Sequence, residues 1–128
     1  MATFELTDDN IAASIADNEI LVIDFWAEWC GPCKKFAPVF EVASEKYPDI
    51  GFAKCDTEAQ QALAGQFGIR AIPTLAIFRG GINVFQQPGM LPAEAIDDLL
   101  RQVQELDMEH LKQLREEEMA KNDASVEG

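Results

Sequence analysis

The 128-residue sequence lacks a long apolar segment and a recognisable leader. No stretch approaches the roughly 20 consecutive apolar residues that cross a bilayer, so we expect no membrane segment. The N-terminus, from Met1 to Asn10, has neither a basic start nor an apolar run before a small-residue cleavage site, so it is not typical of a secretory signal. We therefore expect a cytoplasmic protein.

Positive charge is also scarce. The chain has 10 Lys and Arg against 23 Asp and Glu, a formal net charge of −13. This sign repels phosphate backbones and anionic headgroups, so we expect neither nucleic acid nor a membrane surface as a partner. The three cysteines are an odd number, and two are separated by only two residues. That spacing is poor for a structural disulfide framework and common in redox motifs.

No internal repeat and no Gly/Ser-rich or Pro-rich linker divides the chain. A domain of this length buries roughly two-thirds of its unfolded surface in one core. A helical apolar stripe follows Pro92 and reaches Leu106, after which the apolar residues change phase and charge increases. We predict a domain over 1–106 and an acidic, partly helical extension over 107–128 with a disordered end from Asn122. We expect a monomer.

Alternating strand and helix patterns indicate an α/β protein with a mixed sheet. The segment Ile20–Trp26 is an almost unbroken β-branched and aromatic run, typical of a strand buried on both faces. Thr57 to Gln60 has the spacing of a capping box that opens a helix. We expect strands over 3–6, 20–26, 50–55, 74–78 and 82–85, and helices beginning at Thr7, at the cysteine pair, at Thr57 and near Pro92.

The pair of cysteines forms the motif Cys30-Gly31-Pro32-Cys33, placed between a strand and a helix. At the helix start, Cys30 faces unpaired backbone N–H groups and the positive end of the dipole, which stabilise the attacking thiolate. Cys33, one turn further and more buried, suits the second step of thiol-disulfide exchange. Gly31 and Pro32 shape the turn between the sulfurs.

A zinc site is the alternative for this cysteine pair. Structural zinc generally takes four ligands, and the chain offers only Cys55 and the distant His110 as further soft ligands. Cys55 itself lies in an apolar strand, which favours a small core residue, with a regulatory thiol as the other interpretation.

Two charged residues lie in strands otherwise made of apolar residues. Burial in the middle of 20–26 raises the pKa of Asp24 and allows it to accept a proton from Cys33. An inert, hydrogen-bonded carboxyl at a strand end is the alternative. If strand 50–55 is a neighbour, Lys54 brings its ammonium near Asp24 and offsets part of the burial cost; a surface lysine fits the spacing nearly as well.

The stretch Trp26-Ala-Glu-Trp-Cys-Gly-Pro-Cys-Lys34 closely resembles the active site of thioredoxins, and the resemblance extends from about residue 3 to 106. It implies the thioredoxin fold, with a central mixed sheet of about five strands, four flanking helices and, here, a C-terminal helical extension. It also implies Cys30 as nucleophile, Cys33 as resolving thiol, Asp24 as proton acceptor and Lys54 as its basic neighbour.

A second stretch, Gly68-Ile-Arg-Ala-Ile-Pro-Thr74, resembles the family loop whose cis-proline, here Pro73, lies against the nucleophilic cysteine. The resemblance further implies a flat apolar docking surface for protein disulfides, although Trp29 also fits an ordinary core position. The chain departs from the family at Gln87 to Met90, which bears on client preference. The implied docking residues are Trp29, Gly31, Pro32, Ile72 and Gly89.

This resemblance implies a protein disulfide reductase acting in cell redox homeostasis. Electrons come from NADPH through a thioredoxin reductase, clients are disulfide-bonded proteins, and the chain itself binds no cofactor. The alternative is a thioredoxin-like binding module or co-chaperone that uses the apolar surface and the acidic tail, with redox chemistry secondary.

Overall fold

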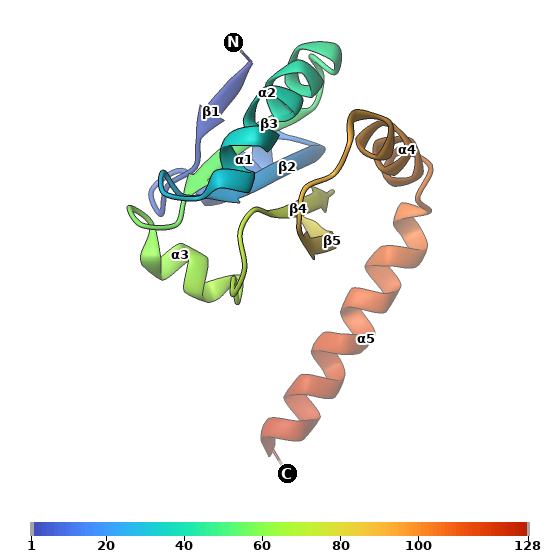
Figure 1. Ribbon diagram of the computed structural model, residues 1–128. Helices are drawn as coiled ribbons and strands as arrows, with labels where there is room; N and C mark the ends of the chain where they lie inside the picture. The colour runs from blue at the N-terminus through green and yellow to red at the C-terminus, as the bar shows by residue number, and fades with distance from the viewer. Residues whose placement is uncertain (1, 128) are drawn as a thin grey trace.

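The computed structural model describes the backbone of residues 2–127 and the side chains of residues 2–120. Its centre is a five-stranded sheet of order β1-β3-β2-β4-β5 (Figure 1). The strands β1, β2 and β3 run parallel, whereas β4 is antiparallel to both β2 and β5. The predicted mixed sheet is confirmed. The strands are β1 (Thr3–Glu5), β2 (Ile20–Trp26), β3 (Gly51–Asp56), β4 (Thr74–Arg79) and β5 (Ile82–Pro88).

Four helices cover the sheet, as predicted, and a fifth follows them. The helices are α1 (Ile11–Asp17), α2 (Gly31–Lys46), α3 (Gln61–Gln66), α4 (Ala93–Gln104) and α5 (Met108–Glu127). Side chains of α2 and α4 pack on one face of the sheet, and side chains of α1 and α3 pack on the other. The central strand β2 is therefore buried on both faces, which explains its unbroken apolar sequence.

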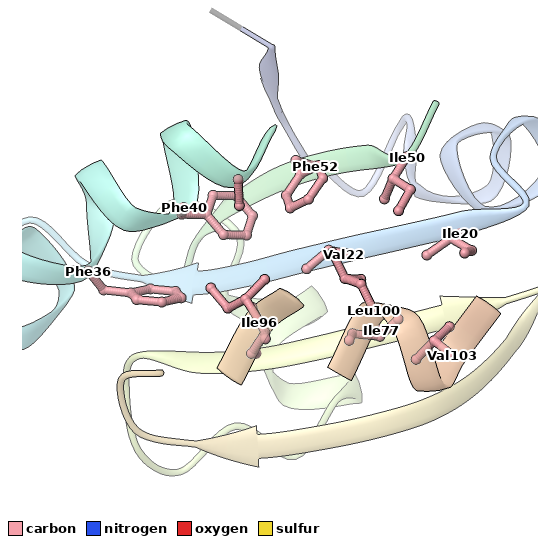
Figure 2. Close-up of a cluster of buried hydrophobic side chains, with 12 residues drawn as sticks. Ile20, Val22, Phe36, Phe40, Ile50, Phe52, Ile77, Ile96, Leu100 and Val103 are labelled. Carbon is pink, nitrogen blue, oxygen red and sulfur yellow. The ribbon is translucent and has the colours of Figure 1, made fainter. Parts of the chain in front are cut away.

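The face under α2 and α4 holds the larger cluster of buried side chains (Figure 2). Phe40 of α2 meets Phe52 of β3 edge to face, with ring centroids 5.3 Å apart. From α4, Ile96 and Leu100 are fully buried against the same layer. Burying each such side chain contributes about 1.5–3 kcal/mol, so this layer fixes α2 firmly on the sheet.

The α1/α3 face is a second apolar layer. It contains Leu21, Ile23 and Phe25 of β2 together with Leu63 of α3, all essentially inaccessible. Phe67, which follows α3, lies 5.0 Å from Phe25 between ring centroids. The carboxyl end of β2 is thus clamped between two layers, and the chain that follows it begins α2.

The predicted start of α3 is wrong. The helix begins at Gln61, and Gln60 at its N-cap makes no side-chain capping bond. The Thr57 hydroxyl instead donates to the Trp26 carbonyl at 3.0 Å, and Asp56 accepts from the N–H groups of Glu58 and Ala59. Thr57 is therefore occupied in linking the ends of β2 and β3.

The extension is the helix α5, which leaves the compact part of the molecule in Figure 1. Near its start, Met108 packs closely over Gly80 in the β4–β5 turn, where a β-carbon would overlap its methyl group. Further along, Leu114 and Met119 are exposed. The helix runs through Asn122 to Glu127, a segment for which the sequence predicts disorder. Within the described residues, no helix is long and apolar enough to cross a membrane.

Candidate active site

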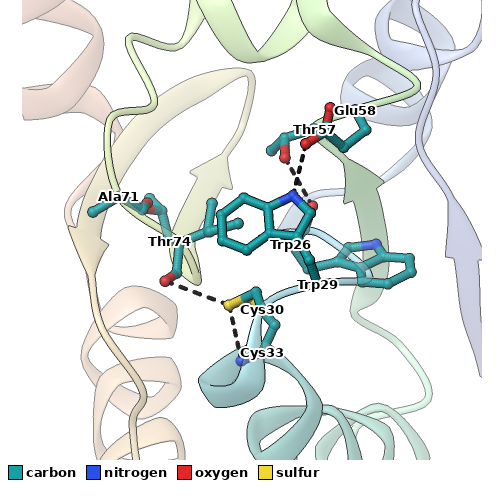
Figure 3. The surroundings of a disulfide bond; sticks show 9 residues. Trp26, Trp29, Cys30, Cys33, Thr57, Glu58, Ala71 and Thr74 are labelled. Carbon is teal, nitrogen blue, oxygen red and sulfur yellow. Dashed lines mark hydrogen bonds between the residues drawn. A yellow bond between two sulfur atoms is a disulfide. The ribbon is translucent and has the colours of Figure 1, made fainter.

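The two cysteines of the motif form a disulfide at the N-terminus of α2 (Figure 3). Their α-carbons are 5.3 Å apart, and both side chains are almost completely buried. Cys30 is the N-cap of the helix, and its Sγ accepts a hydrogen bond from the backbone N–H of Cys33 at 3.2 Å. Pro32 lies in the first turn, where its missing N–H costs no helical bond.

The turn between β2 and α2 produces this geometry. After β2 ends, a tight turn closes with the Cys30 N–H donating to the Ala27 carbonyl at 3.1 Å. The helix then runs 16 residues without interruption, Pro38 included. Its N-terminal N–H groups and dipole favour negative charge at the cap position. When the disulfide is reduced, this position stabilises a thiolate on Cys30.

The loop before β4 lies against the disulfide. The Ile72–Pro73 peptide bond is cis, as the resemblance implies. The Ile72 carbonyl oxygen is 3.7 Å from Cys30 Sγ. The loop is tied on both sides, because Thr74 Oγ1 donates to the Ala71 carbonyl at 2.5 Å and the Gly89 N–H donates to the Pro73 carbonyl at 2.7 Å. The structure therefore brings Ile72 and the dithiol together and joins Gly89 to the same loop.

Trp29 is an exposed residue and not part of the core. Its side chain is 69% accessible, and its indole Nε1–H donates to Glu58 Oε1 at 2.7 Å. A shallow groove beside the disulfide is lined in part by Trp29, Arg70 and Ile72. An exposed aromatic next to a reactive pair is suited to contact another macromolecule. Sequence reasoning did not identify Glu58, which holds the indole in place.

Asp24 lies in the middle of β2 with an accessibility of 0%. Neither of its carboxylate oxygens has a hydrogen-bond partner. The alternative of a hydrogen-bonded carboxyl at a strand end is therefore wrong. Burial raises the pKa of Asp24 to about 7, and the positive charge of Lys54 offsets part of that rise. A carboxyl with this pKa exchanges its proton near neutral pH.

Lys54 is the direct neighbour of Asp24 across the β2–β3 pairing, which confirms that the two strands are adjacent. Its Nζ lies 4.8 Å from the centre of the Trp26 ring. Sequence reasoning assigned no role to Trp26, although the period of two along a strand places it on the same face as Asp24. Trp26 also packs against the cluster of Ala27, Cys30 and Cys33.

The third cysteine, Cys55, is completely buried in β3. Burial, followed by the negative charge of Asp56, raises the pKa of its thiol to about 11. This supports the interpretation of Cys55 as a small core residue. Among the described residues, no group of three or more His, Cys, Asp or Glu side chains is placed to hold a metal ion.

Comparisons with known proteins agree with this geometry. The family model described as Thioredoxin matches residues 2–102. A putative thioredoxin 2 of Streptomyces coelicolor is 51% identical over 119 residues, covering 93% of this chain and 89% of the relative. A thioredoxin of Alicyclobacillus acidocaldarius is 41% identical, covering 80% and 98% respectively.

Solved structures show the same fold. A mutant thioredoxin from Halobacterium salinarum superimposes with a TM-score of 0.75 at 34% identity, covering 82% of this chain and 92% of that one. Thioredoxins carry their redox equivalents on such a Cys-X-X-Cys pair and need no bound cofactor. The chain belongs to the thioredoxin family and is a protein disulfide oxidoreductase, with Cys30 and Cys33 as its redox-active pair.

Proposed function

We propose that Cys30 is the nucleophile of a protein disulfide reductase and that Cys33 resolves the mixed disulfide. The observation that carries this order is the cap position of Cys30, whose sulfur accepts the Cys33 N–H at the positive end of α2. The Cys30 thiolate attacks one sulfur of a client disulfide, and a bond between Cys30 and the client forms. The other client sulfur leaves as a thiolate and takes a proton from solvent.

The second step regenerates the disulfide in the protein. Cys33 transfers its proton to the Asp24 carboxylate, and the resulting thiolate attacks Cys30 Sγ. The bond between Cys30 and the client breaks, and the client leaves fully reduced by two electrons. A pKa of about 7 suits Asp24 to this role, since a proton acceptor works best when its pKa is near the working pH. Lys54 limits how far burial raises that pKa.

Clients dock on the surface around the disulfide. Trp29 and Ile72 offer apolar area there. Gly31 and Pro32 lie exposed between the two cysteines, and the space above Gly31 is open, since a β-carbon there would meet no neighbouring atom. Gly89, with φ +104°, bonds to the Pro73 carbonyl and shapes the loop that carries the cis bond. Met90, which follows Gly89 at the point where the chain departs from the family pattern, is exposed as well.

A reductase must return the protein to the dithiol form after each cycle. The family resemblance supports a thioredoxin reductase that delivers electrons from NADPH, and a role in cell redox homeostasis. A reductive cycle of this kind suits a compartment whose thiols are kept reduced, and we place it in the cytoplasm. The acting unit in this proposal is a monomer.

The test measures insulin reduction with dithiothreitol as electron donor and, separately, with NADPH and a bacterial thioredoxin reductase. We expect Cys33→Ser to stop turnover and to accumulate a mixed disulfide on Cys30, detected by mass spectrometry. Cys55→Ser is the matched control and is expected to turn over normally. Normal turnover by Cys33→Ser would contradict the two-step mechanism, whereas failure with the reductase alone would contradict only the proposed electron donor.

A further inference from the structure

The Lys54 ammonium occupies an unusual position for a lysine next to a buried carboxyl. Lys54 and Asp24 are paired in register on adjacent parallel strands, about 4.8 Å apart, and side chains at paired positions project from the same face. A flexible four-carbon lysine stem spans such a distance easily. Yet among the described residues no carboxylate oxygen lies within 4.0 Å of Lys54 Nζ.

The Lys54 ammonium lies instead over the indole of Trp26. Lys54 Nζ lies 4.8 Å from the ring centre, within the range at which a cation is attracted to the ring face. The backbone of Trp26 is fixed, because its carbonyl accepts from both the N–H and the hydroxyl of Thr57, at 2.9 and 3.0 Å. Its side chain also packs against the cluster of Ala27, Cys30 and Cys33. The ring thus contacts both the lysine and the cluster that holds the two cysteines.

Lys54 and Trp26 both line a cleft that opens between β1 and the ends of β2 and β3. The cleft also includes Glu5, which pairs with Lys54 across the β1–β3 register, and Glu41 of α2. Glu41 Oε1 accepts from the Thr3 hydroxyl at 2.6 Å, while its Oε2 is buried without a partner. The ammonium therefore has acidic groups on its solvent side as well as Asp24 on its inner side.

We propose that Trp26 is a positioning residue, whose ring face holds the Lys54 ammonium off the Asp24 carboxyl so that Asp24 stays free to take the proton of Cys33. This rests on the proposed role of Asp24 in the second step. Both Asp24 oxygens lack a partner and Asp24 is paired in register with Lys54, so we expect a released ammonium to form a direct ion pair with Asp24; a move to Glu5 or to Glu41 Oε2 instead would leave Asp24 without that pair. That pair would stabilise the carboxylate and make Asp24 a poorer proton acceptor.

The cleft that holds the Lys54 ammonium is lined by four ionisable residues, which are Glu5 of β1, Glu41 of α2, and Lys54 and Asp56 of β3. The thiols of the same elements are Cys33 of α2 and Cys55 of β3. The other charged residues of α2, which are Lys34, Lys35, Glu45 and Lys46, and Arg79 of β4 do not line this cleft. Lys54 is therefore the one cation among the described residues that line the cleft, and its charge lowers the pKa of Asp24, so we expect a change at the ring to act on that pKa through Lys54.

The experiment follows the Asp24 carboxyl carbon by NMR in the oxidised protein as the pH is varied, with Asp24→Asn assigning the signal. In the wild type, Asp24 is expected to titrate near pH 7. We expect Trp26→Leu to shift this titration to lower pH, and Trp26→Phe to shift it less, since a smaller ring still attracts the cation. The Phe variant keeps the test available if the Leu variant does not fold.

A second pair of variants separates the lysine from simple exposure to water. Water entering beside Asp24 would also lower the pH at which Asp24 titrates, but this effect would not require Lys54. In the Lys54→Gln background we expect Trp26→Leu to leave the titration unchanged. An unshifted titration in both single variants, or an equal lowering in the Lys54→Gln background, would overturn the proposal. Neither result depends on turnover, so a failure of the proposed reductase mechanism is seen separately with Cys33→Ser.

Discussion

Each face of the sheet buries an ionisable side chain, and the charges around these two side chains differ in sign. Asp24 of β2 and Cys55 of β3 both have an accessibility of 0%. Asp24 lies on the α2/α4 side with a lysine next to it, and the pKa of its carboxyl is about 7. Cys55 lies in the apolar α1/α3 layer, and the pKa of its thiol is about 11.

Burial alone therefore does not make a group reactive. Desolvation is the largest cause of the raised pKa in both cases, and it disfavours the charged form of each group. The difference comes from the neighbours. The charge of Lys54 lowers the pKa of Asp24, which stays near neutral pH. The charges near Cys55 are negative and raise the pKa of its thiol further. In the mechanism proposed above, one face of the sheet thus takes part in proton transfer, while the thiol on the other face stays protonated.

The largest effect is expected from Asp24→Asn. In the oxidised protein at pH 8, raising a carboxyl pKa from 3.8 to about 7 costs the folded state on the order of 4 kcal/mol, and the amide removes this cost. Chemical denaturation at several pH values measures the gain. The same variant should slow breakdown of the mixed disulfide by up to about 100-fold, since it has no proton acceptor.

The pH dependence gives the sign of the Asp24 effect. The folded carboxyl keeps its proton up to about pH 7, while the unfolded one loses it near 3.8. Wild-type stability relative to Asp24→Asn therefore falls as pH rises through this window, and the difference between the two proteins closes below about pH 4. A stability difference that is constant from pH 4 to 8 would show that the carboxyl is not desolvated as described.

Cys55→Ala is expected to have a smaller effect and to leave turnover unchanged. Removing one buried sulfur from the α1/α3 layer costs about 1 kcal/mol of unfolding free energy. In the wild type, iodoacetamide at pH 8 should label Cys30 after reduction and leave Cys55 unlabelled until the protein is denatured. Labelling of Cys55 in the folded protein at a rate similar to Cys30 would remove the contrast between the two faces.

The smallest effect is expected from ending the chain after Leu106. The two packed layers contain no described residue of α5. Met108 lies over Gly80, and Leu111 and Leu114 line an open groove with residues of the β4–β5 turn. Unfolding free energy should change by about 0.5 kcal/mol or less, with insulin reduction unchanged. Met108→Ala in the full-length chain is a control that removes the same contact without changing the turn, where Gly80 has a φ of +56°. A large loss of stability on truncation would mean that the domain does not end at 106.

Much of the fold follows from local patterns. The predicted bounds of the buried strand, Ile20–Trp26, agree with the structure. A strand covered on both faces is made of apolar residues, and in this strand Asp24 is the exception. The start of α3 was not predicted correctly. Thr57 lies at the first position of a capping-box pattern, but its hydroxyl donates to the Trp26 carbonyl instead of capping a helix. That bond joins two strands, and no local pattern encodes it.

The same distinction between local patterns and long-range contacts applies to the site. The dithiol and Asp24 were identifiable from chemically distinctive residues in a short stretch. Trp26 and Glu58 were not identifiable in this way, since each acts on a partner about 30 residues away. Trp26 contacts Lys54, and Glu58 accepts from the indole of Trp29. The exposure of Trp29 also depended on tertiary structure, because an aromatic between a strand and a helix fits a core or a surface equally well.

The bond from the Trp29 indole to Glu58 has a consequence for affinity. A large exposed side chain normally samples several rotamers, and fixing it on binding costs about 0.5–1.5 kcal/mol of conformational entropy. Here the carboxylate of Glu58 restrains the ring at 2.7 Å before any client arrives. In the docking proposed above, the Trp29 ring is therefore preorganised, and we expect Glu58 to contribute to how tightly clients are held.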